Sequence, residues 1–271
     1  MSIKNIMVHL DQGPRTGLRL QLAVDLARTH DARLVGVFAQ RGHAHQVGVV
    51  AQWPSPEYAA AAADSQTQFN EATAGLPNAA WQDLNRGSDA EVLRLLTEKA
   101  RCFDLTILGQ HDAVNTHIPA ELAEHVVLHS GRPALVLPFA GEFSQIFDHP
   151  MIAWHSSPEA ARAVNDALPL IADCKESLVV TISENFDRTG DPAADVMTHL
   201  ACHGVKARSL HVVSEPKELG LMDALLNSLT DEGATLLVMG AQAPAGLPFG
   251  SRGGGTHYVF EHMTVPVLLS H

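Results

Sequence analysis

The chain alternates short apolar runs with amphipathic segments from one end to the other. Residues 3–10 form an apolar, β-branched run that predicts a strand, and residues 11–14 (Asp-Gln-Gly-Pro) signal a loop after it. Leu18, Leu22 and Leu26 recur at four-residue spacing with Ala23 and Ala27 beside them, which predicts a helix with one apolar face. By the same criteria, strands are expected at residues 33–38, 105–108 and 133–137, helices at 57–74, around 92–100 and at 119–129, and a long loop at 42–56.

The second half of the chain repeats the order of the first. Strands are expected at residues 151–154, 178–182, 210–213, 236–239 and 266–269, and helices at 160–171, 193–202, 221–229 and 256–262. The run 105–109 (Leu-Thr-Ile-Leu-Gly) matches the run 236–240 (Leu-Leu-Val-Met-Gly). An order repeated once indicates a duplicated domain, and alternating strands and helices predict parallel sheets covered on both faces. We therefore predict an α/β protein with an N-terminal domain at residues 1–141 and a C-terminal domain at residues 146–271.

Composition and charge narrow the range of functions. With 46% hydrophobic and 18% charged residues, the 271-residue chain has the composition of a folded protein. Its formal net charge of -12 disfavours nucleic-acid binding, which needs a surplus of Lys and Arg. No apolar run of transmembrane length and no cleavable signal pattern are visible, so a cytoplasmic protein without nucleic-acid or membrane partners is expected. Cys102, Cys174 and Cys202 lack metal-type spacing and are expected to be buried as small hydrophobic residues.

Sixteen histidines raise the question of a metal site. His43 and His45 are spaced so that both could meet one ion. No third ligand is close to them in the sequence, however, and Zn²⁺ usually takes three or four protein ligands. His125 and His129 are one helix turn apart and are expected to be partly buried helix positions. No metal site is therefore predicted.

The loops that follow strands are the places to look for a ligand site. In an open parallel sheet, ligands bind beyond the carboxyl ends of the strands, where the strand order reverses. The loop from Gly240 to Thr256 carries six glycines and one arginine and then enters a helix. Glycines before a helix let backbone N–H groups converge on an anion, and the helix N-terminus adds partial positive charge. The alternative is a flexible surface loop capped by Thr256, and composition alone favours neither interpretation.

At this loop the sequence resembles the universal stress protein family. The nucleotide-binding members of that family carry the motif G-x2-G-x9-G-[S/T] between the fourth strand and the last helix. Here the motif positions read Gly240, Ala243 and Gly253-Gly254, so Thr256 is left as the candidate hydroxyl. The resemblance also rests on residues 6–11, 104–109, 153–164 and 262–271, and it covers nearly the whole chain, as in tandem members of the family.

The resemblance implies a fold and a ligand. The implied fold is two tandem Rossmann-like domains, each with a five-stranded parallel sheet in the order 3-2-1-4-5. The implied ligand is an adenine nucleotide, with the glycine loop at its phosphates and an acidic residue after the first strand near it. The first half keeps that residue as Asp11, but no glycine follows Gly109 in its loop and Asp112 would repel phosphate, so this half is not expected to bind ATP. The second half has His155 at the acidic position, and imidazole can stack on or hydrogen-bond to a base or sugar.

Our hypothesis is a stress-response regulatory protein that binds an adenine nucleotide, taken to be ATP, in the C-terminal domain. The residues assigned to the nucleotide are Ala153, Trp154, His155, Met239, Gly240, Gln242, Ala243, Gly253, Gly254, Gly255 and Thr256. The alternative is a protein that binds another small ligand, or a scaffold, in which the glycine loop is structural. No nucleophile elbow and no P-loop lysine are visible, so no catalytic residue is assigned and at most slow ATP hydrolysis is expected. The two domains are expected to pair within the chain, and a homodimer is left open.

Overall fold

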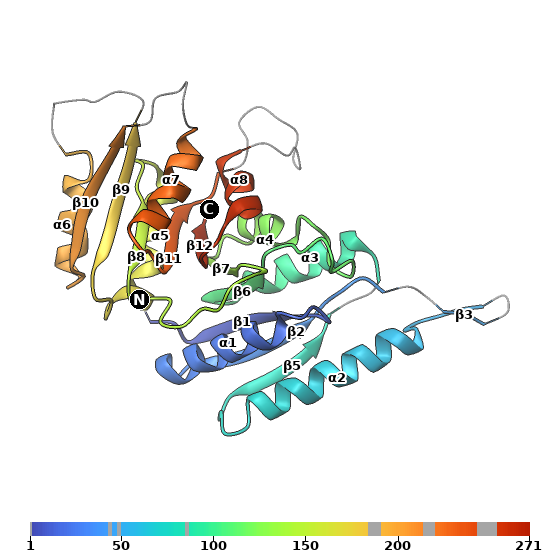
Figure 1. The fold of residues 1–271 in the computed structure, drawn as a ribbon. Helices are drawn as coiled ribbons and strands as arrows, with labels where there is room; N and C mark the ends of the chain where they lie inside the picture. Colours follow the sequence, from blue (N-terminus) through green and yellow to red (C-terminus); the bar gives the residue numbers. More distant parts are fainter. Residues whose placement is uncertain are drawn as a thin grey trace. The chain divides into compact units, whose positions relative to one another are not determined.

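A computed structural model of the chain describes residues 2–42, 45–47, 50–84, 87–183, 191–213, 220–242 and 254–271. The chain divides into two compact units, residues 2–139 and residues 140–271 (Figure 1). Each unit is an alternation of strands and helices, as the apolar pattern predicts.

The N-terminal unit is built on a parallel sheet in the order β7-β6-β1-β2-β5. Its elements are β1 (Asn5–Leu10), α1 (Thr16–His30), β2 (Arg33–Phe38), β3 (His45–Val47), β4 (Val50–Gln52), α2 (Pro56–Ala72), β5 (Ala79–Asp83), α3 (Asp89–Ala100), β6 (Leu105–Gly109), α4 (Leu122–Ser130) and β7 (Ala134–Leu137). The two short strands β3 and β4 form a separate antiparallel pair. Helix α1 contacts α2, and α3 contacts α4. Right-handed crossovers place these two helix pairs on opposite faces of the sheet.

The five parallel strands of the C-terminal unit have the same order, β10-β9-β8-β11-β12. Its elements are β8 (Pro150–Ala153), α5 (Pro158–Ile171), β9 (Ser177–Ser183), α6 (Ala194–Cys202), β10 (Ala207–Val213), α7 (Leu221–Asp231), β11 (Leu236–Gly240), α8 (Gly255–His262) and β12 (Val267–Ser270). Numbered along each unit, both sheets have the order 3-2-1-4-5. The predicted fold class and strand order are therefore confirmed.

The strand order reverses at equivalent places in the two units. In the N-terminal unit the reversal lies between β1 and β6, where Ile6 pairs with Leu105. In the C-terminal unit it lies between β8 and β11, where Pro150 pairs with Leu236. Counting five residues on from Ile6 and from Pro150 makes Asp11 and His155 equivalent positions. The same register makes the two strand-ending glycines of β6 and β11 equivalent.

The structure corrects four details of the expectation. The apolar face of α1 is confirmed only in part: Ala23, Leu26 and Ala27 are buried, but Leu18 and Leu22 are half-buried. The helix also buries Thr16, Arg19, Leu20 and Val24. Strand β5 was not predicted, and the short pair β3 and β4 lies where only a loop was expected. The cysteines are not buried, because Cys102 and Cys202 lie exposed at or just after helix ends and Cys174 is half-exposed.

In the part of the chain that the structure describes, none of the helices has the length and apolar character needed to cross a membrane.

Candidate functional site

The candidate site of the C-terminal unit lies at the carboxyl ends of β8 and β11. Ala153 ends β8, and Gly240 ends β11 after the buried Met239. Because Ile152 and Val238 pair in the parallel ladder, these strand ends lie side by side at one edge of the sheet. The assigned residues fall into three groups along the chain: 153–155, 239–243 and 253–256. The structure brings the ends of the first two groups' strands together.

Trp154 and His155 leave β8 at this edge. The Trp154 amide still donates to the carbonyl of Val180 on β9, at 2.8 Å, and its side chain is half-buried. His155 is exposed. Helix α5 then begins, capped by Ser157, whose hydroxyl accepts a hydrogen bond from the Ala160 amide at 3.2 Å.

Thr256 connects the residues that follow the glycine loop to Gln242, which precedes it. The Gln242 amide donates to Thr256 Oγ1 at 3.0 Å, and the Thr256 hydroxyl lies 3.4 Å from the Gln242 carbonyl. Thr256 is only 3% exposed, whereas Gln242 is exposed, so the contact is partly buried. The contact fastens residues on the two sides of segment 243–253, which lies outside the described residues together with the assigned Ala243 and Gly253.

Helix α8 begins immediately after that segment. Its N-cap is Gly254, which has no side chain to cap the helix, and no side-chain cap bond is made there. The first amides of a helix lack partners within the helix, and they carry partial positive charge. The expectation that Thr256 caps the helix is wrong, because Thr256 is its second residue and its hydroxyl bonds to Gln242.

Gly240 allows β11 to approach α5 closely. A Cβ at Gly240 would lie 2.6 Å from the Ala160 nitrogen and 2.6 Å from the Glu159 carbonyl carbon, both backbone atoms. The side chain of Gln242 reaches the same helix end, with its Nε2 3.2 Å from the Glu159 carboxylate. Hydrogen bonds from its own amide, from Gln242 and from Ser157 lower the pKa of Glu159. Glu159, which the sequence did not single out as a site residue, thus places a carboxylate at this edge.

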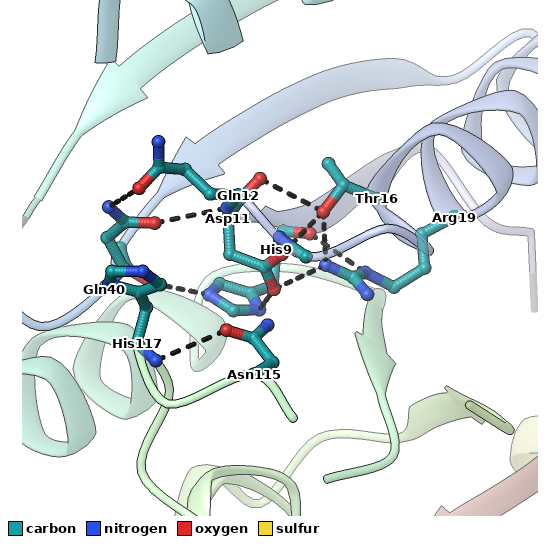
Figure 2. Close-up of polar contacts among 10 residues, drawn as sticks. His9, Asp11, Gln12, Thr16, Arg19, Gln40, Asn115 and His117 are labelled. Atoms are coloured by element: carbon teal, nitrogen blue, oxygen red, sulfur yellow. Dashed lines mark hydrogen bonds and ion pairs between the residues drawn. The ribbon is translucent and has the colours of Figure 1, made fainter. Parts of the chain in front are cut away.

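The corresponding crevice of the N-terminal unit holds a buried ion pair (Figure 2). Arg19 Nη2 on α1 lies 2.6 Å from the Oδ2 of Asp11, and both side chains are about 5% exposed or less. Thr16 Oγ1 and the Gly13 amide donate to the other carboxylate oxygen at 2.6 and 2.5 Å. Burial alone would raise the pKa of Asp11, but Arg19, His9, Thr16 and Gly13 together lower it to about 2. The Asp11 carboxylate is therefore ionised, and both of its oxygens already accept hydrogen bonds from groups of the protein.

His9, on β1, lies next to the Asp11–Arg19 ion pair. Its Nε2 is 2.7 Å from the Ala39 carbonyl, and its Nδ1 is 3.7 Å from Asp11 Oδ2. Burial, assisted by the positive charge of Arg19, lowers the pKa of His9, although Asp11 and the Ala39 carbonyl act in the opposite direction. The imidazole is thus held in its neutral form near pH 7.

The loop after β6 is fastened by its own contacts. The Val114 amide donates to Asp112 Oδ1 at 3.0 Å, and the Arg41 amide donates to the His117 carbonyl at 2.6 Å. The Arg41 guanidinium also donates to the Thr116 carbonyl at 2.8 Å. The loop therefore bonds to itself and to Arg41.

Arg19 is the site residue that sequence reasoning missed. The predicted apolar face of α1 included the buried Ala23 and Ala27, but it continued through Leu18 and Leu22. The signal not used was Thr16 and Leu20, which extend the face of these two alanines on the side that carries Arg19.

The histidines offer no alternative site among the residues described. No group of three or more His, Cys, Asp or Glu side chains arranged to hold a metal ion is found there. His125 and His129 are both half-buried, with rings stacked at a centroid distance of 4.3 Å, so the prediction of partly buried helix positions is confirmed. His43 lies outside the described residues.

Comparisons with known proteins identify the fold. No protein-family model and no curated protein matches the chain. Among solved structures, the chain is similar to a universal stress protein from Archaeoglobus fulgidus DSM 4304, with a TM-score of 0.74 and 15% identity over 99% of this chain and 96% of that chain. It is also similar to a functionally unknown protein from Pseudomonas aeruginosa PAO1, with a TM-score of 0.61 and 15% identity over 99% of this chain and 92% of that one. The likeness extends over both units, and at this identity it is a likeness of fold.

Proposed function

Because the chain has the universal stress protein fold in two tandem copies, we propose that it is a stress-response regulatory protein that binds an adenine nucleotide in its C-terminal unit. ATP is the nucleotide we propose. The observation that carries the proposal is the start of α8: an uncapped helix N-terminus at the strand-order reversal, fastened to the end of β11 through Thr256 and Gln242. Amides at such a helix end bind phosphate oxygens well.

The roles of the assigned residues follow from where they lie. We assign the phosphates to the backbone of Gly253, Gly254, Gly255 and Thr256, with Gln242 and Ala243 at the other end of the loop. Ala153, Trp154 and His155 are assigned to the base or ribose, since they leave the neighbouring strand at the same edge. Met239 and Gly240, at the end of β11, are assigned to the part of the site between these two sides.

The output of the site is proposed to be a change of conformation or of partner. Hydrolysis needs a base that activates water, and we assign none. The carboxylate of Glu159 is bound to Gln242 at this edge, but Glu159 is half-exposed in the first turn of α5. We propose a cytoplasmic protein with one nucleotide-binding half, residues 146–271, and one half, residues 1–141, that does not bind nucleotide.

A second candidate is a protein that binds a different small ligand or acts as a scaffold, with a structural glycine loop. Two observations favour it. The Thr256 hydroxyl is engaged by Gln242, and the Glu159 carboxylate brings negative charge to the edge where phosphate would lie.

One experiment separates the two candidates. Purified protein is denatured, and the supernatant is separated on an anion-exchange column beside adenine nucleotide standards. The stripped protein is then dialysed to equilibrium against ATP. Recovery of an adenine nucleotide, or saturable uptake of ATP, supports the first candidate. Absence of both supports the second.

A further inference from the structure

Arg19 lies across the point where the strand order of the N-terminal sheet reverses. Its Nε donates to the carbonyl of His9 on β1 at 3.3 Å. On the side of β6, a Cβ at Gly109 would lie only 2.6 Å from Arg19 Nη1. The guanidinium therefore reaches from one of the two central strands to the other, in the crevice where ligands of such sheets bind.

Little space remains around this side chain. The cavity lined by Asp11, Arg19, Gly109, Gln110 and Phe139 measures about 30 Å³. A buried water needs roughly 10–15 Å³, so the cavity has room for about two waters and not for a nucleotide. The side chain of Gln110 closes one wall, because its Oε1 accepts a hydrogen bond from the Phe139 amide at 3.0 Å.

The C-terminal unit has no equivalent of this arginine among its described residues. Beside Gly240 lies the backbone of Glu159 and Ala160 instead of a guanidinium. The arginine of helix α5, Arg162, is exposed and donates to the carbonyl of His271. The equivalent of Asp11 in that unit is His155, which would offer Arg162 no carboxylate.

We propose that the guanidinium of Arg19 occupies the crevice of the N-terminal unit in the place where a ligand would bind. It stabilises the folded unit without a bound molecule, and it excludes a nucleotide from the crevice. The inference rests on the proposed function in one respect, since it sets the number of nucleotides per chain at one. Arg19 thus adds to the missing glycine loop as a reason why this half of the duplicated fold is closed to a nucleotide.

The energetics of buried ion pairs support this role. Removing one partner of a buried pair leaves an uncompensated charge, which is strongly destabilising, whereas removing both partners is often tolerated. Asp11 is held by Arg19, Thr16 and Gly13, and only Arg19 among them carries the neutralising charge. The stability of the unit should therefore depend on a guanidinium at this place, whether or not it is attached to the chain.

The test is rescue of the full-length Arg19→Ala variant by methylguanidinium, followed by thermal melting. The matched control is Arg28→Ala on the same helix, which removes an exposed arginine 3.5 Å from Asp25. Arg19→Ala is expected to lower the melting temperature by about 10 °C, and Arg28→Ala by about 1 °C or less. Millimolar methylguanidinium should raise the melting temperature of Arg19→Ala and leave the wild type and Arg28→Ala unchanged. Equal melting of the two variants, or an equal response of all three proteins, would overturn the proposal.

A second pair of variants covers the case in which Arg19→Ala does not fold. Arg19→Met leaves Asp11 unpaired, and Arg19→Met with Asp11→Asn removes both charges. The double variant should have a higher melting temperature than the single one, and an equal or lower melting temperature would overturn the pairing.

Equilibrium dialysis of the wild type against ATP completes the test: two ATP per chain would overturn the closure of the N-terminal unit. Absence of ATP binding would instead overturn the proposed function, while the melting results would still decide the role of Arg19.

Discussion

The hydroxyl of Thr256 and the backbone amide of Gln242 lie 3.0 Å apart, and their hydrogen bond joins the end of β11 to the first turn of α8. It fixes both ends of the segment proposed to hold phosphate. Replacing Thr256 by valine keeps the shape of the side chain and removes this partly buried hydrogen bond, a loss of roughly 0.5–1.5 kcal/mol. We expect a melting temperature lower by several degrees and an ATP dissociation constant about tenfold higher.

The control for this change is Thr198→Val. Thr198 is an exposed threonine on α6 whose hydroxyl donates to the Ala194 carbonyl within its own helix. Its replacement should leave both the melting temperature and ATP binding close to those of the wild type. If Thr256→Val bound ATP as tightly as Thr198→Val, the connection between β11 and α8 would have no part in the site.

Gly240 should be intolerant of any side chain. Because a Cβ there would meet backbone atoms of α5 at 2.6 Å, we expect Gly240→Ala to destabilise the protein by about 1–3 kcal/mol. Gly17→Ala is the matched control, since a Cβ added at Gly17 in α1 would meet no atom beyond its own stretch of helix within 4 Å. It should raise stability by up to about 1 kcal/mol, because alanine favours a helix over glycine. Urea unfolding of both variants checks the prediction, and an unaffected Gly240→Ala would contradict the close packing of β11 on α5.

His9 should make the protein sensitive to acid. Its pKa is lowered in the folded state by burial, so below about pH 6.5 the unfolded chain binds a proton that the folded chain does not. Stability therefore falls as the pH falls through this value. In His9→Gln, whose amide can still donate to the Ala39 carbonyl, the decline of melting temperature between about pH 7 and pH 5 should be shallower. His30 and His125, whose pKa values are also lowered mainly by burial, would account for the remaining slope. Equal slopes for both proteins would contradict the burial of a neutral His9.

His155 tests the proposed base or ribose side of the site. Its imidazole is exposed just after β8 and can hydrogen-bond to a base or sugar. His155→Asn should therefore raise the ATP dissociation constant, measured at one fixed pH beside the wild type. The same affinity in both proteins would show that His155 does not contact the nucleotide.

The regular recurrence of apolar residues made most of the fold predictable from the sequence. Buried strands such as β2 and β6 have continuous apolar runs, and the repeated order of elements indicated the duplication. Strand β5, with the sequence Ala-Ala-Trp-Gln-Asp, has no β-branched residue and lies at the edge of its sheet, so its pairing with β2 decides its conformation.

The candidate sites were predictable only in part. The glycines and Thr256 were visible as a loop that enters a helix, whereas the bond to Gln242 depends on how the two loop ends meet. The pairing of Arg19 with Asp11 was not predicted, because a charged residue in a helix pattern is normally assigned to the solvent face. Only the fold shows that this arginine faces the end of β6.

The most direct test of the account is a calorimetric titration of the full-length protein with ATP, repeated with the double variant Gly253→Ala and Gly254→Ala. A side chain at these glycines would keep the backbone away from phosphate while leaving both sheets intact. We predict one ATP per chain in the wild type and a much weaker interaction in the variant, with the melting temperature of the ligand-free protein little changed. An unchanged affinity in the variant, or no binding by the wild type, would contradict the assignment of the nucleotide to the loop before α8.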